Sequence, residues 1–420
     1  MRLLLLSHWS HTGFGTVTLE LGERFVALGI DLRVLAVNHR GEPIKGPLAG
    51  RLWPANINGD AFGGNISAEA IDGTFWTTFD PDDHWTPDVV LVVSDVSGLL
   101  AHMGRLTEAR HDAWKNARVY HYVPIEGDNL PPMWRQLWDL VEPVAMSDYG
   151  ARVIGEHIGR PVSRIYHGVD TEVFYPVSPG RPIRVRGNTL RSKEDCKLFF
   201  ERDPDRALLL RADRNAMRKF YPKTFEAFAL IVEREPDVDL VLHCRPIDPG
   251  ADGPDLIQEL LRYPAEVRQR VSWTLAHDTY VGFSRPELNA LYNAADVYFS
   301  TTGGEGFGLT LAESLAAGTP VVVTDWAADA ETVGDGGILV PPLHDTYGQP
   351  VRFHHQTYGM DFGVPDARGF VQPTLDLLAN RKARRDLGAA GRLHVKRSFD
   401  WDTAAGQFVD LFSQASEAAA

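Results

Sequence analysis

The chain has 420 residues, a length typical of two domains, and its 44% hydrophobic and 23% charged residues are those of a globular protein. Subtracting 56 acidic from 42 basic residues leaves a net charge of −14, which disfavours binding of nucleic acid or anionic membrane by the whole surface. Two cysteines, Cys196 and Cys244, cannot form a disulfide framework and match no zinc-site spacing. With no apolar stretch long enough for a signal peptide or a membrane span, these features predict a cytoplasmic protein.

Short apolar runs alternate with helical stretches in the first 170 residues. The predicted buried strands and the helices between them are, in chain order, Leu3–Leu6, helix Leu19–Leu28, Leu32–Val37, Val89–Val93, Val119–Val123, Pro143–Met146 and helix Tyr149–His157. Such alternation is typical of a parallel sheet covered by helices on both faces.

The same pattern begins again after residue 206. The predicted strands and helices are Ala207–Leu210, helix Lys223–Arg234, Leu240–His243, Val271–Leu275, helix Arg285–Ala294, Val297–Ser300, Val321–Thr324 and Ile338–Val340. The chain is therefore predicted to be an α/β protein of two doubly wound domains. The Pro-, Gly- and Arg-rich stretch 176–206 has no clear period and is predicted to connect them. Its run from Arg181 to Lys193 contains no acid, and it is interpreted either as a solvated loop or as a contact for an anionic acceptor.

A turn with two glycines follows the first predicted strand. Gly13 and Gly15 lie where a helix begins, and backbone amides at such a place can hold an anion. A dinucleotide fingerprint requires a third glycine where Thr18 stands and an acid where Asn38 stands. Because both are missing, a nicotinamide-dependent dehydrogenase is disfavoured, and either a tight turn or a donor-binding loop remains.

The strongest signal is the passage Thr302–Val323, in which a glycine-rich loop joins a strand to a helix ending at Gly318. Loop amides and the helix N-terminus converge on one point at the carboxyl edge of the sheet, a suitable place for a diphosphate. Glu305 and Glu313 have seven residues between them. Two carboxylates are poor partners for a phosphate, but they are good acceptors for sugar hydroxyls on either side of it.

This passage resembles the Glu-x7-Glu motif of retaining glycosyltransferases with the GT-B fold, of the glycosyltransferase group 1, family 4-like type. The resemblance implies two facing Rossmann-like domains with a cleft between them and a nucleoside-diphosphate sugar as donor. It places Glu305 by the hydroxyls of the donor sugar and Glu313 on the nucleotide ribose. The donor-binding residues would further include Gly13, Gly15, Gly306, Phe307, Gly308, Leu309 and Thr310.

The stretch that follows the first strand of the second domain resembles the family's Arg-x4-Lys element. Arg214 and Lys219 match that spacing, and in the family such a pair clamps the donor diphosphate. A planar guanidinium and a point charge can together neutralise a leaving diphosphate without a metal. Arg211 and Arg218 are alternatives for these roles.

The resemblance also covers the end of the first domain and the end of the chain. Ser147–Gly150 and Ile165–Pro176 resemble the stretches that end the family's N-terminal domain, and Ser398–Trp401 resembles the start of its final helix. The predicted boundaries are 1–175 for an N-terminal acceptor-binding domain, 176–206 for the connection, 207–398 for the nucleotide-sugar-binding domain and 399–420 for a helix that crosses back to the N-terminal domain.

One departure from the family concerns the acceptor side. Many relatives have a histidine at the end of the fourth strand, whereas His121 precedes Pro124, where this strand is expected to end. His121 is therefore interpreted either as a wall residue or as an acceptor-facing one. Glu126 and Asp128 are better placed at the rim, where a carboxylate can orient or deprotonate an acceptor hydroxyl. Seven of the ten tryptophans lie in the first domain, as core residues or as stacking surfaces for sugar rings.

Together these features predict a retaining hexosyltransferase that uses a UDP- or GDP-sugar and needs no metal or other cofactor. Its predicted catalytic residues are Glu305, Arg214, Lys219 and Glu126. The acceptor is left open among a small molecule, a glycan and a modified nucleic-acid base. The alternatives are a nonhydrolysing sugar-nucleotide epimerase of the same fold, a glycosyltransferase of modified DNA bases, and a nucleotide-sugar-binding protein without catalysis.

Overall fold

The structure is a computed structural model that describes residues 1–55, 64–106, 117–274 and 282–417. The chain forms two compact units. The first comprises Met1–Ile125, Pro131–Gly168 and Trp401–Ala420, and the second comprises Glu126–Leu130 and Val169–Asp400. Among the described residues, no helix has both the length and the apolar character needed to cross a membrane.

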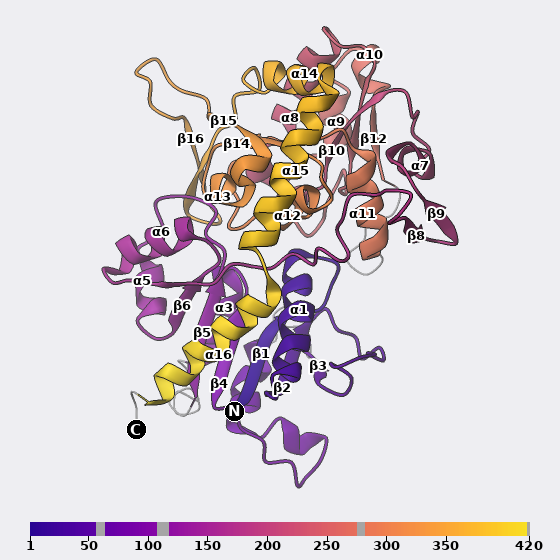
Figure 1. Cartoon of the computed structure of the whole chain (residues 1–420). Coiled ribbons are helices and arrows are strands. Elements are labelled where there is room, and N and C mark those ends of the chain that lie inside the picture. Colours follow the sequence, from indigo (N-terminus) through magenta and orange to yellow (C-terminus); the bar gives the residue numbers. More distant parts are fainter. Residues whose placement is uncertain (56–63, 107–116, 275–281, 418–420) are drawn as a thin grey trace. The chain divides into compact units, whose positions relative to one another are not determined.

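The first unit is built on a seven-stranded parallel sheet in the order β3-β2-β1-β4-β5-β6-β7 (Figure 1). The strands are β1 (Arg2–His8), β2 (Asp31–Val37), β3 (Leu52–Pro54), β4 (Val89–Val93), β5 (Arg118–Val123), β6 (Glu142–Ala145) and β7 (Ser163–Arg164). The predicted strands are confirmed within one or two residues at their ends. The edge strands β3 and β7 were not predicted, because three or two residues carry no measurable alternation.

Helices flank this sheet and bury its apolar strands. They are α1 (Gly13–Ala27), α2 (Gly64–Asp72), η1 (Trp76–Thr78), α3 (Val96–Leu106), α5 (Met133–Trp138), α6 (Asp148–Ile158) and α16 (Trp401–Glu417). The chain's last helix, α16, packs on α1: Phe25 meets Phe408 edge to face at 6.1 Å, and Arg24 donates to Asp402 at 2.6 Å. The far end of the sequence thus completes the core of the first unit.

An arginine lies inside the tryptophan-rich part of this unit. The Arg33 guanidinium is 5.5, 4.6 and 4.7 Å from the ring centroids of Trp53, Trp76 and Trp85. Two hydrogen bonds of 2.7 and 2.9 Å also join Arg33 to Asp83. These three rings are therefore occupied by the protein's own cation, which argues for a structural role. Trp114 lies outside the described residues.

The second unit contains a six-stranded parallel sheet in the order β12-β11-β10-β13-β14-β15. The strands are β10 (Ala207–Arg211), β11 (Val238–Leu242), β12 (Val271–Trp273), β13 (Val297–Ser300), β14 (Val321–Thr324) and β15 (Gly337–Val340). All six predicted strands are confirmed, although Leu275, the predicted end of one, lies outside the described residues. The prediction of two doubly wound α/β halves is therefore confirmed for each unit.

The helices of the second unit cover both faces of its sheet (Figure 1). They are α7 (Lys193–Phe199), η2 (Met217–Lys219), α8 (Tyr221–Val232), α9 (Leu256–Leu260), α10 (Ala265–Arg268), α11 (Arg285–Ala294), α12 (Leu309–Ala316), α13 (Asp329–Val333), η3 (Gly334–Gly336), α14 (Val371–Ala379) and α15 (Arg381–Ser398). Two antiparallel hairpins accompany the sheet, formed by β8 (Ile183–Val185) with β9 (Asn188–Leu190) and by β16 (Arg352–His355) with β17 (Met360–Gly363).

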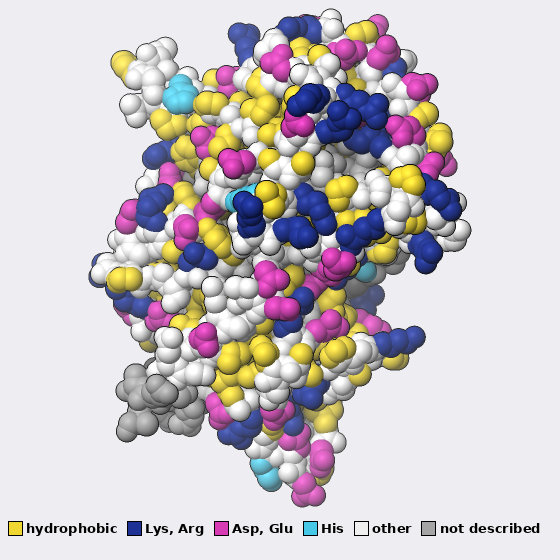
Figure 2. Space-filling model, viewed as in Figure 1, with side chains coloured by type: hydrophobic (Ala, Val, Ile, Leu, Met, Phe, Trp, Pro, Cys, Tyr) yellow, Lys and Arg dark blue, Asp and Glu magenta, His cyan; other side chains and the backbone are white. Residues whose placement is uncertain are grey.

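Residues 176–206, expected as a connection, lie inside the second unit and contain the β8–β9 hairpin and α7. The cations of their basic run are partly neutralised, because Arg181 pairs with Glu172 at 2.8 Å and Lys193 pairs with Asp296 at 3.3 Å. A larger concentration of positive charge is on α15, with seven Lys and Arg against one acid. Figure 2 shows basic side chains gathered where Figure 1 draws this helix. The excess of negative charge is thus unevenly distributed.

Candidate functional site

The strand order of the second sheet reverses between β10 and β13, which lie side by side. Because parallel strands end at the same edge, the loops that follow these two strands meet there. Arg211, at the end of β10, links them: its buried guanidinium donates to Thr301 Oγ1 at 2.8 Å, to Asp213 at 3.0 Å and to the carbonyl of Lys219. Arg211 therefore shapes the site and is buried away from a ligand.

The loop after β13 needs glycine at two positions. Gly304 has φ 141°, and a Cβ atom there would lie 2.3 Å from the carbonyl oxygen of Glu126. Gly308 has φ 85° and precedes α12, where a Cβ atom would lie 2.9 Å from Leu311 Cδ1. The predicted strand, glycine loop and helix are confirmed, and α12 begins at the end of this loop, where free helix amides can hold an anion.

Lys219 and Glu305 form a buried ion pair at this edge. Lys219 Nζ donates to Glu305 Oε1 and, at 3.1 Å, to Asp213 Oδ1. Burial by itself raises the pKa of Asp213, but the nearby charges of Lys219 and Arg211 outweigh it and lower that pKa to about 2. Two residues singled out in the sequence, 86 positions apart, are thus brought together. Asp213 was missed, although an acid directly after a strand at this edge was a usable signal.

A second acid missed in the sequence, Asp329, begins α13 beside this pair. The amide of its neighbour Ala328 donates to the carbonyl of Glu305 at 3.1 Å. Asp329 is fully buried, and within the described part of the chain neither carboxylate oxygen has a hydrogen-bond partner. Burial, followed by the charge of Glu305, raises the pKa of Asp329 well above its ordinary value. Burial and the nearby Glu305 therefore both favour the protonated form of Asp329.

Arg218 connects the glycine loop with the predicted rim residue Glu126. Its guanidinium lies 2.5 Å from Glu126 Oε1 and 3.5 Å from Glu305 Oε2, and it donates to the carbonyl of Gly304 at 3.1 Å. Burial lowers the pKa of Arg218, but the two glutamates outweigh this effect and raise it. Three of the four predicted catalytic residues, Glu305, Lys219 and Glu126, therefore share one cluster with Arg218.

Arg214 lies elsewhere. Its side chain is 54% exposed and points to the loop after β11, where it pairs with Asp248 at 2.8 Å and donates to the carbonyl of Gly250. Burial raises the pKa of Asp248, but the hydrogen bond from Arg214 and further contacts outweigh it and lower that pKa. The Arg-x4-Lys spacing therefore identified a cation whose side chain points to the loop after β11 in this structure.

The second glutamate of the motif is held by a tyrosine. Tyr292 on α11 donates its hydroxyl to Glu313 at 2.7 Å, and Tyr298 on β13 donates to Thr310 at 2.9 Å. Both tyrosines are buried, which fixes the direction of the two α12 side chains. Phe307 packs edge to face on Phe399 within the core of the unit at 4.9 Å, so only its backbone can contact a donor.

In the first unit, the ring of His121 is buried and both its nitrogens are occupied. Trp138 Nε1 donates to Nδ1 at 3.3 Å, so Nε2 carries the hydrogen and donates to the carbonyl of Ser94 at 3.1 Å. Burial lowers the pKa of His121 to about 4. His121 is thus a neutral core residue, which corrects its placement on the acceptor side and agrees with the alternative interpretation as a wall residue.

The turn with Gly13 and Gly15 begins α1. A Cβ atom at Gly15 would lie 1.9 Å from the carbonyl oxygen of Ser10, so the turn needs glycine for its own geometry. Thr18, which stands where a dinucleotide fingerprint has glycine, donates to Ser7 on β1 at 2.7 Å. The helix is thereby fastened to the strand by a side chain, and the departure from that fingerprint has a structural reason.

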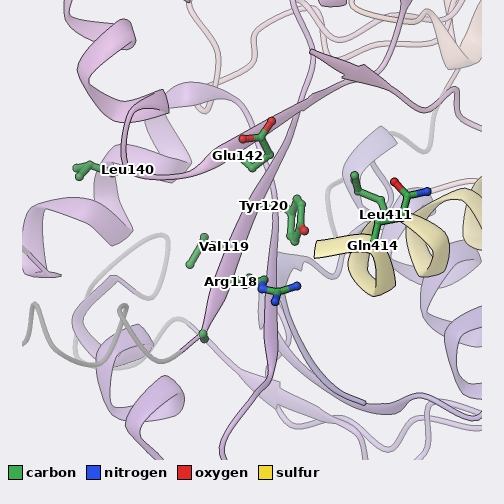
Figure 3. A pocket seen from close by; sticks show the side chains of 8 residues that line it. Arg118, Val119, Tyr120, Leu140, Glu142, Leu411 and Gln414 are labelled. Atoms are coloured by element: carbon green, nitrogen blue, oxygen red, sulfur yellow. The ribbon is translucent and has the colours of Figure 1, made fainter. Parts of the chain in front are cut away.

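A cavity in the first unit lies at the other end of its sheet from Gly13 and Gly15. It has a volume of about 560 Å³ and lies at the amino ends of β5 and β6, beside α16 (Figure 3). Its lining residues are Ala117, Arg118, Val119, Tyr120, Leu140, Glu142, Leu411 and Gln414. None of the predicted acceptor-side residues lines it.

The β16–β17 hairpin was not predicted, yet it contacts three loops of the site. Asp361 pairs through its backbone with Asp128 in both directions at 2.9 Å, and the amide of Gly363 donates to the carbonyl of Gly303 at 3.1 Å. His355 Nε2 donates to Asp252 at 2.5 Å, because its Nδ1 accepts the amide of Tyr358. Alternating polar and apolar residues around Gly359 were the available signal.

Comparison with known proteins agrees with this architecture. Residues 220–347 match the family model described as glycosyl transferases group 1. Sucrose-phosphate synthase from Thermosynechococcus elongatus superposes over 100% of both chains with a TM-score of 0.71 at 17% identity. A glycosyltransferase from Rickettsia africae superposes over 98% of both chains with a TM-score of 0.69 at 14% identity. The chain has the GT-B fold, and its residues 220–347 are similar to the group 1 glycosyltransferases.

Curated relatives of this GT-B protein match parts of it. The D-inositol 3-phosphate glycosyltransferase of Xylanimonas cellulosilytica is 33% identical over 40% of the chain and 34% of its own length. The phosphatidyl-myo-inositol mannosyltransferase of Mycobacterium tuberculosis is 26% identical over 67% and 61%. The chain thus spans about a third to three-fifths of these relatives. In this GT-B protein the group 1 match contains Glu305 and Glu313 and begins directly after Lys219.

Proposed function

We propose that this protein transfers a hexose from a UDP- or GDP-sugar to an acceptor hydroxyl with retention of anomeric configuration and without a metal. The observation that carries the proposal is the position of the Lys219–Glu305 pair. It lies at the sheet edge where the glycine loop leads into α12. Cations and helix amides there would stabilise a leaving diphosphate, the charge that develops during the reaction.

The two glutamates of the motif have separate roles in this proposal. Glu305 would accept hydrogen bonds from the hydroxyls of the donor sugar, and Glu313, oriented by Tyr292, would bind the ribose. The departing phosphate would help to deprotonate the acceptor on the face from which it leaves, so no protein nucleophile is required. Among the described residues, no group of three or more His, Cys, Asp or Glu has the arrangement of a metal site; independence from metal stays a prediction.

The acceptor is proposed to be a polyhydroxylated molecule that carries a phosphate. Relatives with such names support this choice, among them D-inositol 3-phosphate glycosyltransferase and the mannosylfructose-phosphate synthase of Agrobacterium fabrum, which is 28% identical over 43% of the chain. A panel of inositol phosphates and hexose phosphates is therefore the first to test with each donor. Conversion of a donor alone into an epimeric sugar nucleotide, without release of the nucleoside diphosphate, would indicate an epimerase instead.

A thermal-shift panel of UDP-, GDP-, ADP- and dTDP-sugars tests the donor site. We expect one nucleotide series to raise the melting temperature of the wild type and to have less effect on K219A and E305A. K223A is the matched control, because Lys223 pairs with the partly exposed Glu226 of its own helix. If no nucleotide stabilises the wild type, or if all three variants respond as the wild type does, the proposed site is wrong.

A further inference from the structure

The ion pair between Arg218 and Glu126 has no part in the proposed reaction as described so far. Arg218 follows Met217 and precedes Lys219, so it lies in the same short turn as the proposed phosphate-binding lysine. Its guanidinium reaches the glycine loop at the carbonyl of Gly304. A guanidinium binds the paired oxygens of a carboxylate or of a phosphate with the same planar arrangement of donors.

We propose that Arg218 binds the donor diphosphate and that Glu126 occupies Arg218 until the donor arrives. The inference rests on the proposed function and names two residues of the same site. The donor would exchange one oxyanion for another at the guanidinium. Glu126 would then accept a hydrogen bond from a substrate hydroxyl.

Charge and exposure indicate which carboxylate the diphosphate would displace from the two cations. Glu126, Glu305 and Asp213 together surround Arg218 and Lys219, so a diphosphate would meet repulsion unless one of them moves away. The side chain of Glu126 is 17% exposed, against 10% for Glu305 and 4% for Asp213. Glu126 therefore loses the least burial when it is displaced, and water can solvate it.

The β16–β17 hairpin keeps the displaced residue nearby. The backbone of Asp128 is paired with that of Asp361, and Asn129 donates to the Asp361 carboxylate at 2.5 Å. Arg352 also lies 3.4 Å from the Asp128 carboxylate. Because these contacts hold the two residues that follow Gly127, the side chain of Glu126 can turn away from Arg218 while its backbone stays against Gly304.

The test is isothermal titration of UDP and GDP into the wild type, E126Q and E126A. We expect the better-bound diphosphate to bind about fivefold more tightly to E126Q, because the protein no longer has to release Arg218 first. E126A should gain at least as much affinity as E126Q. The glutamine amide of E126Q can still accept a weak hydrogen bond from Arg218, whereas alanine cannot. E172Q, which neutralises the exposed partner of Arg181, is the matched control and should bind as the wild type does.

A double-mutant cycle identifies Arg218 as the cause. We expect R218M to weaken diphosphate binding by about fivefold or more, and E126Q to have no effect in the R218M background. R218K, which keeps the charge, serves if R218M fails to fold. Tighter binding by E126Q that persists without Arg218, or equal affinity of wild type, E126Q and E126A, overturns this inference and leaves the proposed function standing. If neither the wild type nor any variant binds UDP or GDP, both this inference and the proposed function are overturned.

Discussion

The buried pair of Lys219 and Glu305 leads to a quantitative prediction about stability. Replacing Lys219 with Met keeps the length of the side chain but leaves Glu305 and Asp213 without their shared cation. Both are nearly inaccessible to solvent. Removing one partner of a buried ion pair costs about 3 kcal/mol, chiefly because the remaining charge is buried and uncompensated. We expect K219M to lower the free energy of unfolding by about that amount at pH 7.

The difference in the free energy of unfolding between wild type and K219M should become smaller as the pH falls. In the wild type, the pKa of Asp213 is lowered from 3.8 to about 2, so this group contributes about 2 kcal/mol that is present above pH 4 and is lost only as the pH falls toward 2. In K219M, Asp213 keeps Arg211 but loses Lys219, the charge that lowers its pKa most, so its pKa is higher in the variant than in the wild type. Asp213 then takes up a proton in the folded variant at a pH where it stays ionised in the wild type, and this uptake reduces the loss of stability as the pH falls.

Urea unfolding, followed by tryptophan fluorescence at pH 7, 6 and 5, measures the difference. K223M is the control, because the pair of Lys223 with Glu226 is partly exposed and such pairs contribute less than about 1 kcal/mol. A difference between wild type and K219M that is the same at all three pH values, or no larger than that of K223M, would refute the reasoning.

Three other changes have expected outcomes. Arg33→Met removes the paired hydrogen bonds to Asp83 and three ring contacts, and thermal unfolding should show a loss of about 2 kcal/mol, reduced by half in R33K. Gly304→Ala forces a Cβ atom against a backbone carbonyl and should weaken UDP binding at least tenfold in titration calorimetry. G348A should not weaken it, because Gly348 also has a positive φ, of 76°, but lies in open space. Burial lowers the pKa of His121 to about 4, so below pH 6.5 the unfolded state binds more protons and the wild type loses about 2 kcal/mol between pH 7 and 5; H121Q should lose less, and an unchanged slope in urea unfolding would contradict this.

Motif spacing located the centre of the site but not all its members. The glycine loop with Glu305 could be predicted because a strand, glycines and a helix follow one another within a short stretch, where local rules suffice. Lys219 could be placed beside it because two adjacent parallel strands end at one edge. Arg214 shows the limit of spacing: the sequence gives its distance along the chain from Lys219, whereas its direction toward Asp248 depends on a loop that packs beside it.

The partners of these residues were beyond sequence reasoning. The pairing of Arg218 with Glu126 joins positions 92 residues apart (218 − 126), and no local pattern relates them. Asp329 is unusual because it is buried and its carboxylate has no hydrogen-bond partner among the described residues, a property that exists only after the unit has packed. The same holds for the β16–β17 hairpin, whose residues acquire a role through contacts with three separate loops.

By itself, the sequence determined the α/β class, both parallel sheets and the glycine loop. Buried strands, helices and glycine turns each follow from the residue types of a short stretch of chain. Only the tertiary structure decided which charges meet. Ion pairs form between side chains that are close in space, and the order of the strands sets which side chains are close. The same order decides whether a buried carboxylate has a cation or a hydrogen-bond donor beside it. The chain has a net charge of −14, and the order of its strands decides which few of its acidic residues lie beside Lys219 and Arg218.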